Sequence, residues 1–415
     1  MLRNVGCMVL AFAAVLAGGS LLASAAHPQT EAANKALSYV RTLQNAGGGF
    51  PFFGPVSSAG ETIDAVLAFV AADIDPATVK KDGKSPLHYL EAQTDSYITT
   101  PGHLAKLVLG LAAAGEDPRD FAGHDLVAGM NAGFNSASHS YGDGAFDHAL
   151  YMLARARLHL SPTHGSASHL KSKQLNDGCW AWKDIWACDT NTTALAIEAL
   201  LAAGVDPSDG AVEDALDYLE DAQNNDGGWP YDPLSSWGTD SDANSTAFVI
   251  QALVAAGEKI GDWDKGGTTP LEALLRFQNP QTGAFTYSYS GKDDAYATYQ
   301  SIPALLLEPY PGAPKTRDRE ATHTPKPTRT PTPTTTPTAE PTATPLPPSV
   351  APTVVATPPS AALTREVAGI TVAAAGEGAT SGEDSTTMRI LMTLLLAGGG
   401  ALSAAGGVII GARRR

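Results

Sequence analysis

The sequence Gln-Asn-Asn-Asp-Gly-Gly-Trp occupies residues 223–229 and separates two stretches that are typical of helices. Variants of it recur at residues 44–50, 176–180 and 278–285. Each has a Gln-Asn pair or its relic, a glycine-containing turn and then an aromatic residue. Glycine permits the left-handed backbone conformations with which helices commonly end. The motif therefore predicts a repeated unit in which one helix stops, turns and leads into the next.

A second repeat is an apolar helix that ends in Ala-Ala-Gly or a close equivalent. It appears as AFVAADIDP, GLAAAGEDP, ALLAAGVDP and ALVAAGEKI, with marker residues Asp73, Gly115, Gly204 and Gly257. Successive markers are 42, 89 and 53 residues apart. The interval of 89 residues is long enough for two units, and the helix between them, at 146–158, matches the repeat only weakly. We expect a sixth helix at 294–307. A period of roughly 42 to 53 residues is long enough for one helix pair per unit.

Six such pairs predict an all-α fold, a closed alpha-alpha toroid over residues 30–309. Its inner helices should be the stretches rich in Ala, Leu and Val, because a helix that is apolar nearly all round must be buried on both sides. An open solenoid is the structural alternative. A closed ring would not need the separate polar caps that a solenoid requires.

The two ends of the chain predict export and anchoring. Residues 1–26 carry Arg3, an apolar run and the small residues Ala23-Ser24-Ala25, which together are typical of a signal peptide. Residues 390–412 form an uncharged stretch of 23 residues, long enough for a transmembrane helix across a core of ~30 Å. Three arginines at 413–415 predict a cytoplasmic tail, so the N-terminal ectodomain should lie outside the cell membrane as a single-pass protein.

Residues 311–387 are expected to form a disordered Pro/Thr-rich stalk. Fourteen prolines stand between Pro311 and Pro359, with almost no large apolar residue to bury. Outside the two apolar ends the chain has 43 acidic against 22 basic residues. Such an excess of negative charge repels phosphate backbones, so nucleic-acid binding is excluded as the expected function. The charge is typical of a solvated, soluble exterior.

The chain has three cysteines, and their positions predict whether a disulfide forms. Cys7 would leave with the signal peptide, which leaves Cys179 and Cys188 in an oxidising compartment. A disulfide between these two residues is therefore the default expectation.

Together the two repeats resemble those of the squalene cyclase and protein prenyltransferase superfamily. Its alpha-alpha toroid carries a Gln-x-x-x-Gly-x-Trp motif, which residues 223–229 match best. The resemblance covers roughly residues 30 to 309 and implies the toroid fold. The same toroid also serves binding proteins such as the cobalamin carriers, so the fold alone does not decide the function.

The resemblance also implies where cyclase chemistry would be found. Protonating cyclases carry Asp-x-Asp-Asp-Thr-Ala at the start of an inner helix, and residues 189–194 and 242–247 have related strings. Here Asn191 and Asn244 stand at the position of the proton-donating aspartate. An amide has no proton acidic enough to protonate an alkene, so we expect no cyclisation by the family's mechanism.

The resemblance to prenyltransferases suggests zinc as a cofactor to consider. Those enzymes hold zinc through Asp, Cys and His, and Cys188-Asp189 with His103 or His148 offers these residue types. Zinc requires a thiolate, whereas Cys188 is expected to be oxidised. We therefore predict neither a metal site nor another cofactor.

The predicted ligand-binding residues fall into two groups. Starts of inner helices should gather at one mouth of the ring, and aromatic residues in three consecutive turns could stack on a ligand. The polar and helix-start candidates are Asp189, Asn191, Asp242, Asn244, Asp294 and Tyr296, and the aromatic candidates are Trp182, Trp186, Trp237, Tyr287 and Tyr289.

Structural roles compete with this interpretation. Asp189 and Asp242 directly precede apolar helices, where a side-chain oxygen accepts unpaired amide protons and capping favours the ionised carboxylate. Trp180, Trp229 and Phe285 hold equivalent repeat positions and should wedge adjacent helix pairs together. The histidines fit no metal-binding helical motif, and ordinary polar contacts account for them.

The leading functional hypothesis is a membrane-anchored extracellular binding module without catalytic residues. Its ligand would be apolar or aromatic-stacking, a glycan or another protein. A divergent terpene cyclase or a carbohydrate-active enzyme with two working carboxylates is the alternative, and a purely structural surface protein is a third. An enclosed acid pair would favour an enzyme, whereas an aromatic-walled mouth would favour binding.

Overall fold

The computed structural model describes residues 28–315 apart from 53, 184–185, 237 and 290, and two short strands, β5 (Arg365–Val367) and β6 (Ile370–Val372). The predicted signal peptide, transmembrane helix, tail and most of the predicted stalk lie outside this part. Within it, no helix combines the length and apolar character needed to cross a membrane.

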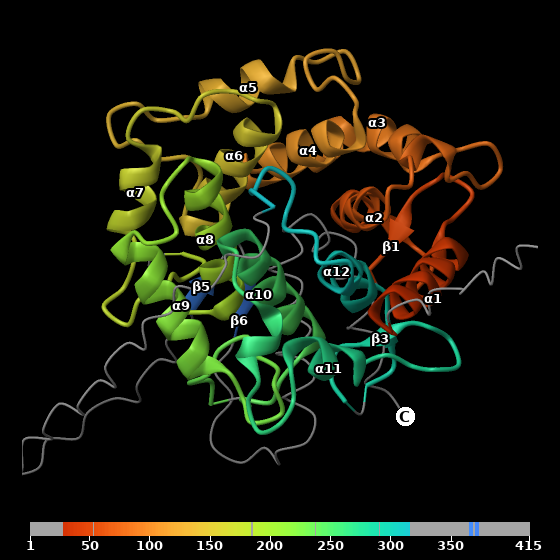
Figure 1. Cartoon of the computed structure of the whole chain (residues 1–415). Helices are drawn as coiled ribbons and strands as arrows, with labels where there is room; N and C mark the ends of the chain where they lie inside the picture. The colour runs from red at the N-terminus through yellow and green to blue at the C-terminus, as the bar shows by residue number, and fades with distance from the viewer. Residues whose placement is uncertain are drawn as a thin grey trace, which may run out of the picture.

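Six inner helices form a closed ring within residues 28–315. They pack side by side in chain order, and the last packs against the first (Figure 1). These helices are α2 (Ala59–Ala71), α4 (Pro101–Ala114), α6 (Ala145–Arg157), α8 (Thr190–Ala202), α10 (Ala243–Ala256) and α12 (Ala295–Leu305). The closed, all-helical ring agrees with the predicted toroid.

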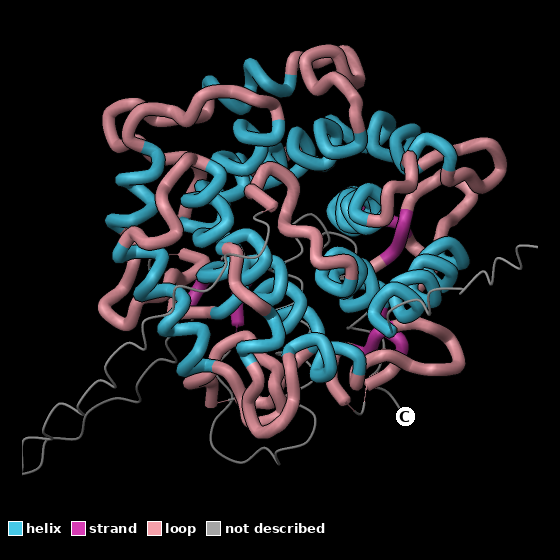
Figure 2. Tube along the Cα trace, viewed as in Figure 1, coloured by secondary structure: helices cyan, strands magenta, loops and turns pink. Residues whose placement is uncertain are grey.

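In the described part of the chain, six outer helices surround the ring, and each packs mainly against one inner helix. They are α1 (Pro28–Leu43), α3 (Pro86–Tyr97), α5 (Leu126–Ala132), α7 (Ser166–Ser172), α9 (Gly210–Ala222) and α11 (Pro270–Leu275). The 3-10 helices η1 (Pro76–Thr78) and η2 (Ile260–Trp263) lie in outer connections. Long loops join these elements around the perimeter (Figure 2).

Short antiparallel strand pairs complete two of the turns. β1 (Phe50–Pro51) pairs with β2 (Ser57–Ser58) so that Phe50 lies opposite Ser58. β3 (Phe285–Thr286) pairs with β4 (Asp293–Asp294) so that Phe285 lies opposite Asp294. Each pair brings the aromatic residue of a turn next to the start of the following inner helix.

Burial separates the two layers as the residue types predict. Every residue of α10 is buried, as expected for a helix packed on both sides. The outer helix α9 buries only Val212, Ala215, Leu219 and Ala222, which recur every three or four residues along one face. Its other face is acidic and points to solvent.

The glutamine of the repeat motif joins neighbouring units. Gln223 Nε2 donates to the carbonyl of Gly227 in its own turn, at 3.0 Å, and to the carbonyl of Trp263 in the next unit, at 2.8 Å. Gly227 has φ 83°, and a Cβ there would lie 2.5 Å from the carbonyl oxygen of Thr268. Glycine is therefore required both for the turn and for the close approach of the next unit.

The same contacts close the ring between its last and first units. Gln278 Nε2 donates to the carbonyl of Ala32 in α1 at 2.8 Å. A Cβ at Gly283, which has φ 78°, would lie 2.6 Å from the carbonyl oxygen of Lys35. The motif that links successive units thus also joins the two ends of the repeat.

The aromatic residues of the turns act as wedges, as predicted. Trp180, Trp229 and Phe285 are fully buried. Trp229 donates its backbone N–H to Thr246 Oγ1 at 3.1 Å and its indole N–H to the carbonyl of Leu219 at 2.6 Å. A threonine four residues after the helix cap accepts the same bond in three other units.

The degenerate unit keeps this bond with a different residue. The backbone N–H of Tyr141 donates to Nδ1 of His148 at 3.0 Å, and Nε2 of His148 lies 3.0 Å from the carbonyl of Ser166. Burial lowers the pKa of His148 to about 4, so the ring is neutral, with its proton on Nε2. This histidine holds the turn together, in agreement with a structural role.

Candidate functional site

Equivalent positions of the inner helices lie level with one another in the ring. The sixth residue after the N-cap is Asp64 in α2, Lys106 in α4 and Gln300 in α12, and Lys106 contacts Asp64 directly. The inner helices therefore begin at one mouth, here called the N-terminal mouth, and end at the other, the C-terminal mouth. The predicted helix-start residues Asp189, Asp242 and Asp294 belong to the first of these.

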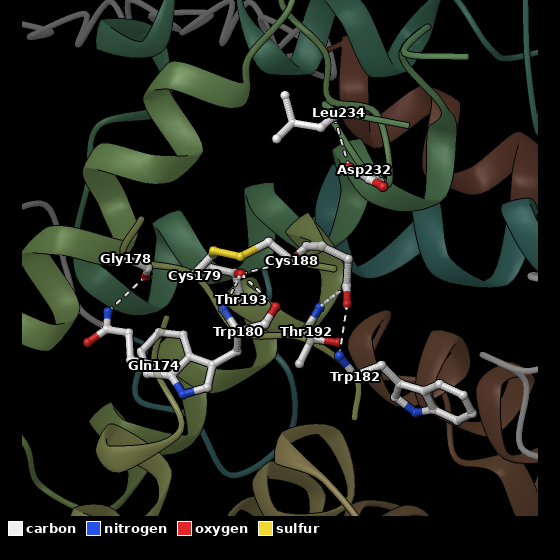
Figure 3. Close-up of a disulfide and its surroundings, with 11 residues drawn as sticks. Gln174, Gly178, Cys179, Trp180, Trp182, Cys188, Thr192, Thr193, Asp232 and Leu234 are labelled. Carbon is white, nitrogen blue, oxygen red and sulfur yellow. Dashed lines mark hydrogen bonds between the residues drawn. A yellow bond between two sulfur atoms is a disulfide. The ribbon is translucent and has the colours of Figure 1, made fainter. Parts of the chain in front are cut away.

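Asp189 caps α8 with both carboxylate oxygens engaged. Its Oδ1 accepts from the backbone N–H of Thr192 at 2.6 Å, and its Oδ2 accepts from the backbone N–H of Trp182 at 3.2 Å (Figure 3). The Tyr231 side chain also acts to lower the pKa of this carboxylate. Burial nevertheless raises the pKa of Asp189 to about 7 and outweighs these hydrogen bonds. The hydrogen bonds of the cap favour the ionised carboxylate, as expected, and burial is the larger effect.

Asp242 and Asp294 repeat this arrangement. Asp242 accepts from the backbone N–H and the hydroxyl of Ser245, both at 2.8 Å, and burial raises its pKa to about 6. Asp294 accepts from the backbone N–H of Ala297 at 2.8 Å, and burial raises its pKa. All three aspartates are helix caps, and their carboxyl groups are occupied by bonds within the protein.

The two asparagines that stand in place of the cyclase acid are buried. Asn191 is 2% exposed, and its Oδ1 accepts from the Thr190 hydroxyl at 3.3 Å. Asn244 is 3% exposed, and neither its Oδ1 nor its Nδ2 has a hydrogen-bond partner. An unpaired buried amide costs about 1–3 kcal/mol for each group left unsatisfied. Among the residues that the structure describes, Asn244 is thus a polar group of the N-terminal mouth without a hydrogen-bond partner.

The aromatic candidates separate into different places. Trp182 and Trp186 are partly buried and meet edge to face at 5.7 Å, with Lys183 over the Trp182 ring at 4.9 Å. Tyr296 is buried against Phe52 at 5.6 Å, and Tyr287 is partly buried. Trp237 lies outside the described residues.

Tyr289 is held at the outer edge of the ring. It is 45% exposed, stacks on Phe277 at 4.1 Å and donates its hydroxyl to Asp226 Oδ2 at 2.9 Å. Burial and the Asp226 carboxylate raise the pKa of the phenol. These contacts tie Tyr289 to an outer turn instead of the mouth.

A second repeated aromatic position escaped the sequence analysis. Phe52, Trp182, Tyr231 and Tyr287 each follow the wedge aromatic of their turn by two residues. Backbone bonds connect two of these segments to neighbouring helix starts, because the N–H of Thr190 donates to the Tyr231 carbonyl and that of Ala243 to the Tyr287 carbonyl. Aligning the four turns on their wedge residues would have identified Phe52 and Tyr231.

The predicted disulfide is present. Cys179 and Cys188 are bonded, with their Cα atoms 5.8 Å apart, directly before the Asp189 cap (Figure 3). The zinc alternative requires Cys188 as a thiolate, and that sulfur is consumed by the bond. In the part of the chain that the structure describes, no group of three or more His, Cys, Asp or Glu residues could hold a metal ion.

Inside the ring lies a buried ion pair that the sequence analysis missed. Lys106 Nζ lies 2.9 Å from Asp64 Oδ2, and both side chains are buried. Burial raises the pKa of Asp64 although Lys106 opposes this effect. Glu61 is one turn closer to the N-terminal mouth, and burial raises its pKa to about 7, again against the attraction of Lys106. Glu61, Asp64 and Lys106 were not predicted as site residues because they lie within helices whose other residues are mostly apolar, and their spacing matches no known motif.

The lumen contains a third buried acid. Glu198 of α8 is fully buried, and this desolvation raises its pKa to about 8. Its Oε1 accepts the backbone N–H of Tyr310 at 2.8 Å, whereas Oε2 has no partner. Tyr310 belongs to the segment that follows α12.

A cavity of about 190 Å³ opens at the C-terminal mouth. Asp64 Oδ1 and Arg157 Nε are buried there without hydrogen-bond partners. About half of the rest of its lining is polar or aromatic, including Gln251, Tyr299, Gln300 and Tyr310, and the remainder consists of aliphatic residues, prolines and a glycine. Among the residues that the structure describes, the cavity therefore presents one acceptor and one donor atom without a hydrogen bond, with Gln300 also close enough to Asp64 to lower its pKa.

Comparisons with known proteins support the fold. Residues 148–291, about a third of the chain, match the family model described as squalene-hopene cyclase C-terminal domain. No curated protein sequence matches the chain. The match confirms that the repeats resemble those of the squalene cyclase superfamily.

Solved structures with similar folds include proteins of different activities. The type II terpene cyclase MstE from Scytonema is 15% identical with a TM-score of 0.48, and the match covers 67% of this chain and 97% of that one. A protein from Actinoplanes is 14% identical with a TM-score of 0.49, covering 67% and 99%. The GH76A alpha-1,6-mannanase from Salegentibacter is 10% identical with a TM-score of 0.49, covering 68% and 98%. At these identities the chemistry must be argued from the residues of this chain.

Proposed function

We propose that this chain is an exported, membrane-anchored toroid that binds a small polar ligand in its lumen and does not initiate cyclisation with a proton. The observation that carries the proposal is the cavity at the C-terminal mouth, where Asp64 Oδ1 and Arg157 Nε lack partners. Buried polar groups are normally hydrogen-bonded. A ligand that both donates and accepts hydrogen bonds would satisfy the two atoms together.

The polar character of the lumen argues against a polyprene substrate. An apolar chain placed beside the Asp64–Lys106 ion pair would leave buried polar atoms unsatisfied and without water. Asn191 and Asn244 occupy the position of the initiating acid and have no suitable proton. The carboxyl oxygens of the adjacent caps are engaged with backbone amides and hydroxyls.

Among the ligand classes expected from the sequence, a hydroxyl-rich molecule such as a glycan fits this lining best. Hydroxyl groups donate and accept at once, as Asp64 and Arg157 require together. The aromatic residues Tyr299 and Tyr310 in the wall offer flat faces against which a sugar ring can pack. A purely apolar ligand would contact the apolar side chains of the wall but leave the two polar atoms without partners.

A carbohydrate-active enzyme on the same toroid is the second candidate, and one observation favours it. Glu61 and Asp64 lie near each other in the lumen, and burial raises the pKa of both, that of Glu61 to about 7. Glycoside hydrolysis uses one protonated and one ionised carboxyl group. Release of a reducing sugar from an oligosaccharide by the wild type, and its loss in Glu61→Gln, would favour this candidate over simple binding.

Thermal unfolding with named sugars tests the binding proposal. We expect glucose, mannose, galactose or one of their disaccharides at millimolar concentration to raise the Tm of the full chain, because a ligand that binds only the folded state stabilises it. Gln251→Leu, which removes an amide from the cavity wall, should abolish the shift. The exposed Gln281→Leu should keep it. Equal behaviour of wild type and Gln251→Leu with every sugar would refute a sugar site in this cavity.

A further inference from the structure

Residues 308–315, here called the strap, cross the opening of the ring after α12. Figure 1 shows this segment in cyan running from α12 across the centre of the ring toward α6. Five of its residues form part of the cavity wall, namely Glu308, Pro309, Tyr310, Pro311 and Gly312. The strap therefore forms the outer boundary of the cavity on which the proposed function rests.

One side chain fastens the strap to the inner helices. Tyr310 is buried and stacks on Phe248 of α10, with ring centroids 6.1 Å apart and planes at 18°. Its backbone N–H donates to Glu198 Oε1 at 2.8 Å. Within the described residues this is the sole hydrogen bond from residues 309–315 to the helices of the ring.

The remaining strap contacts are largely internal. Lys315 pairs with Glu308, and the N–H of Ala313 donates to the Tyr310 carbonyl at 3.0 Å. Gly312 has φ 99°, and a Cβ there would lie 2.3 Å from the carbonyl oxygen of Leu153. Beyond Tyr310, none of the strap residues is fully buried. The strap thus coheres as a small unit that rests closely on α6, with Ala313 packed against the core and Tyr310 as its one buried residue.

We propose that the strap is a lid that swings away from α6, α8 and α10 as a unit and so controls access to the lumen cavity. Withdrawing Tyr310 opens the cavity wall and frees Glu198, while the twelve helices keep their contacts. Segments with few buried side chains open locally at lower free energy than the whole fold. The proposal concerns regulation of the proposed binding site, but its test requires no ligand.

Thiol labelling measures the opening directly. The two toroid cysteines are bonded to each other, so a full chain carrying Cys7→Ser and Leu67→Cys has one free thiol, on the cavity wall. We expect slow reaction with N-ethylmaleimide when the strap is native. Tyr310→Ala and Gly312→Ala should each accelerate it by about 10-fold or more, because they remove the anchor or force the strap from Leu153.

Two controls separate lid opening from general destabilisation. Gly115→Ala imposes the same left-handed strain at φ 84° in open space and should leave the rate unchanged. A second probe, Val212→Cys in the buried face of α9, should stay protected in both strap variants. Equal labelling of Leu67→Cys with native and altered straps would overturn the proposal, and so would acceleration at both probe positions.

Amide hydrogen exchange measures strap opening in the wild-type chain, so the result does not depend on whether a variant folds correctly. The Tyr310 amide should exchange at least about 10-fold faster than the amides of α8 and α10, through an opening that denaturant hardly changes. Exchange of Tyr310 only through global unfolding would overturn the lid. Absence of sugar binding in a protein whose strap opens as described would refute the proposed ligand and leave the lid standing.

Discussion

Lys106 illustrates how single residues govern the interior of this toroid. Its ammonium group pairs with Asp64 and partly offsets the rise that burial causes in the pKa of Glu61. Removing one partner of a buried ion pair leaves the other charge uncompensated. The lumen is therefore most sensitive to changes that unbalance charge.

We expect Lys106→Met to reduce the free energy of unfolding by about 3–5 kcal/mol. The double variant Asp64→Leu with Lys106→Met should recover much of this loss, because both charges are then replaced by apolar groups. Urea denaturation of the three proteins measures the difference. A double variant as unstable as Lys106→Met would mean that shape, and not charge, dominates at this position.

Buried acids make stability depend on pH in a defined direction. Burial raises the pKa values of Glu61 and Asp189 to about 7 and that of Glu198 to about 8, far above those of an unfolded chain. The folded state therefore binds more protons, and the stability from these groups is complete below about pH 4 and falls as pH rises to 8. His148, with its pKa lowered to about 4, acts oppositely, but only below about pH 6.5.

Consequently Tm should fall between pH 6.5 and 8.5, where the acids act alone. Glu198→Gln cannot titrate at this position yet keeps an oxygen for the Tyr310 N–H, so its decline should be shallower. Calorimetric scans at several pH values compare the two proteins. A Tm that rises over this interval in the wild type would contradict the assignment of raised pKa values.

At the scale of elements, the repeat is held together by side chains that bond to the backbone of the following unit. Gln278 performs this function between α11 and α1, where the chain supplies no covalent continuity around the ring. The corresponding bonds of Gln44, Gln174 and Gln223 join units that are already consecutive. At this closure, no covalent link between the two units remains if the Gln278 hydrogen bond is lost.

Gln278→Ala should lower the free energy of unfolding by about 1–3 kcal/mol, since it leaves a buried carbonyl without its donor. Exchange of the α1 amides should become faster than exchange of the α8 amides. The neighbouring exposed Gln281→Ala should change neither quantity. Equal acceleration of amide exchange in α1 and α8 would contradict this prediction, because the contact between the first and last units would then open only when the whole ring unfolds.

The disulfide constrains the turn before α8. Replacing both Cys179 and Cys188 with serine should lower stability by about 2–3 kcal/mol, because the bond restricts a short loop of the unfolded chain. Non-reducing denaturation curves of the two proteins provide the measurement. Free-thiol labelling of the native wild type should find neither toroid cysteine, and reaction of both would contradict the bond.

At the scale of the whole molecule, the ring and the proposed membrane anchor at 390–412 are separate segments of the chain. Deleting residues 389–415 should release a soluble protein whose Tm matches that of the full chain, because the ring closes on itself within residues 28–315. Fractionation of cells after washing with high salt checks the location. A truncated protein that remains with the membranes would show that residues 390–412 are not the anchor.

The sequence by itself determined the number of helix pairs, their inner or outer place and the disulfide. These features depend on local properties: Ala-rich stretches that must be buried on both sides, glycines at helix ends, and two remaining cysteines nine residues apart. The wedge role of Trp180, Trp229 and Phe285 followed equally from their repeated position.

Only the tertiary structure decided what the lumen contains. The lumen brings together residues that are far apart along the chain, namely Asp64, Lys106, Glu198 and Tyr310. They interrupt apolar patterns but follow no regular spacing, so the local sequence does not predict that they are in contact. The same holds for the pKa of Asp189, since the identity of a capping residue does not reveal how completely the next turn desolvates it. Burial and the meeting of distant residues arise from closure of the ring, and closure is a property of all six units together.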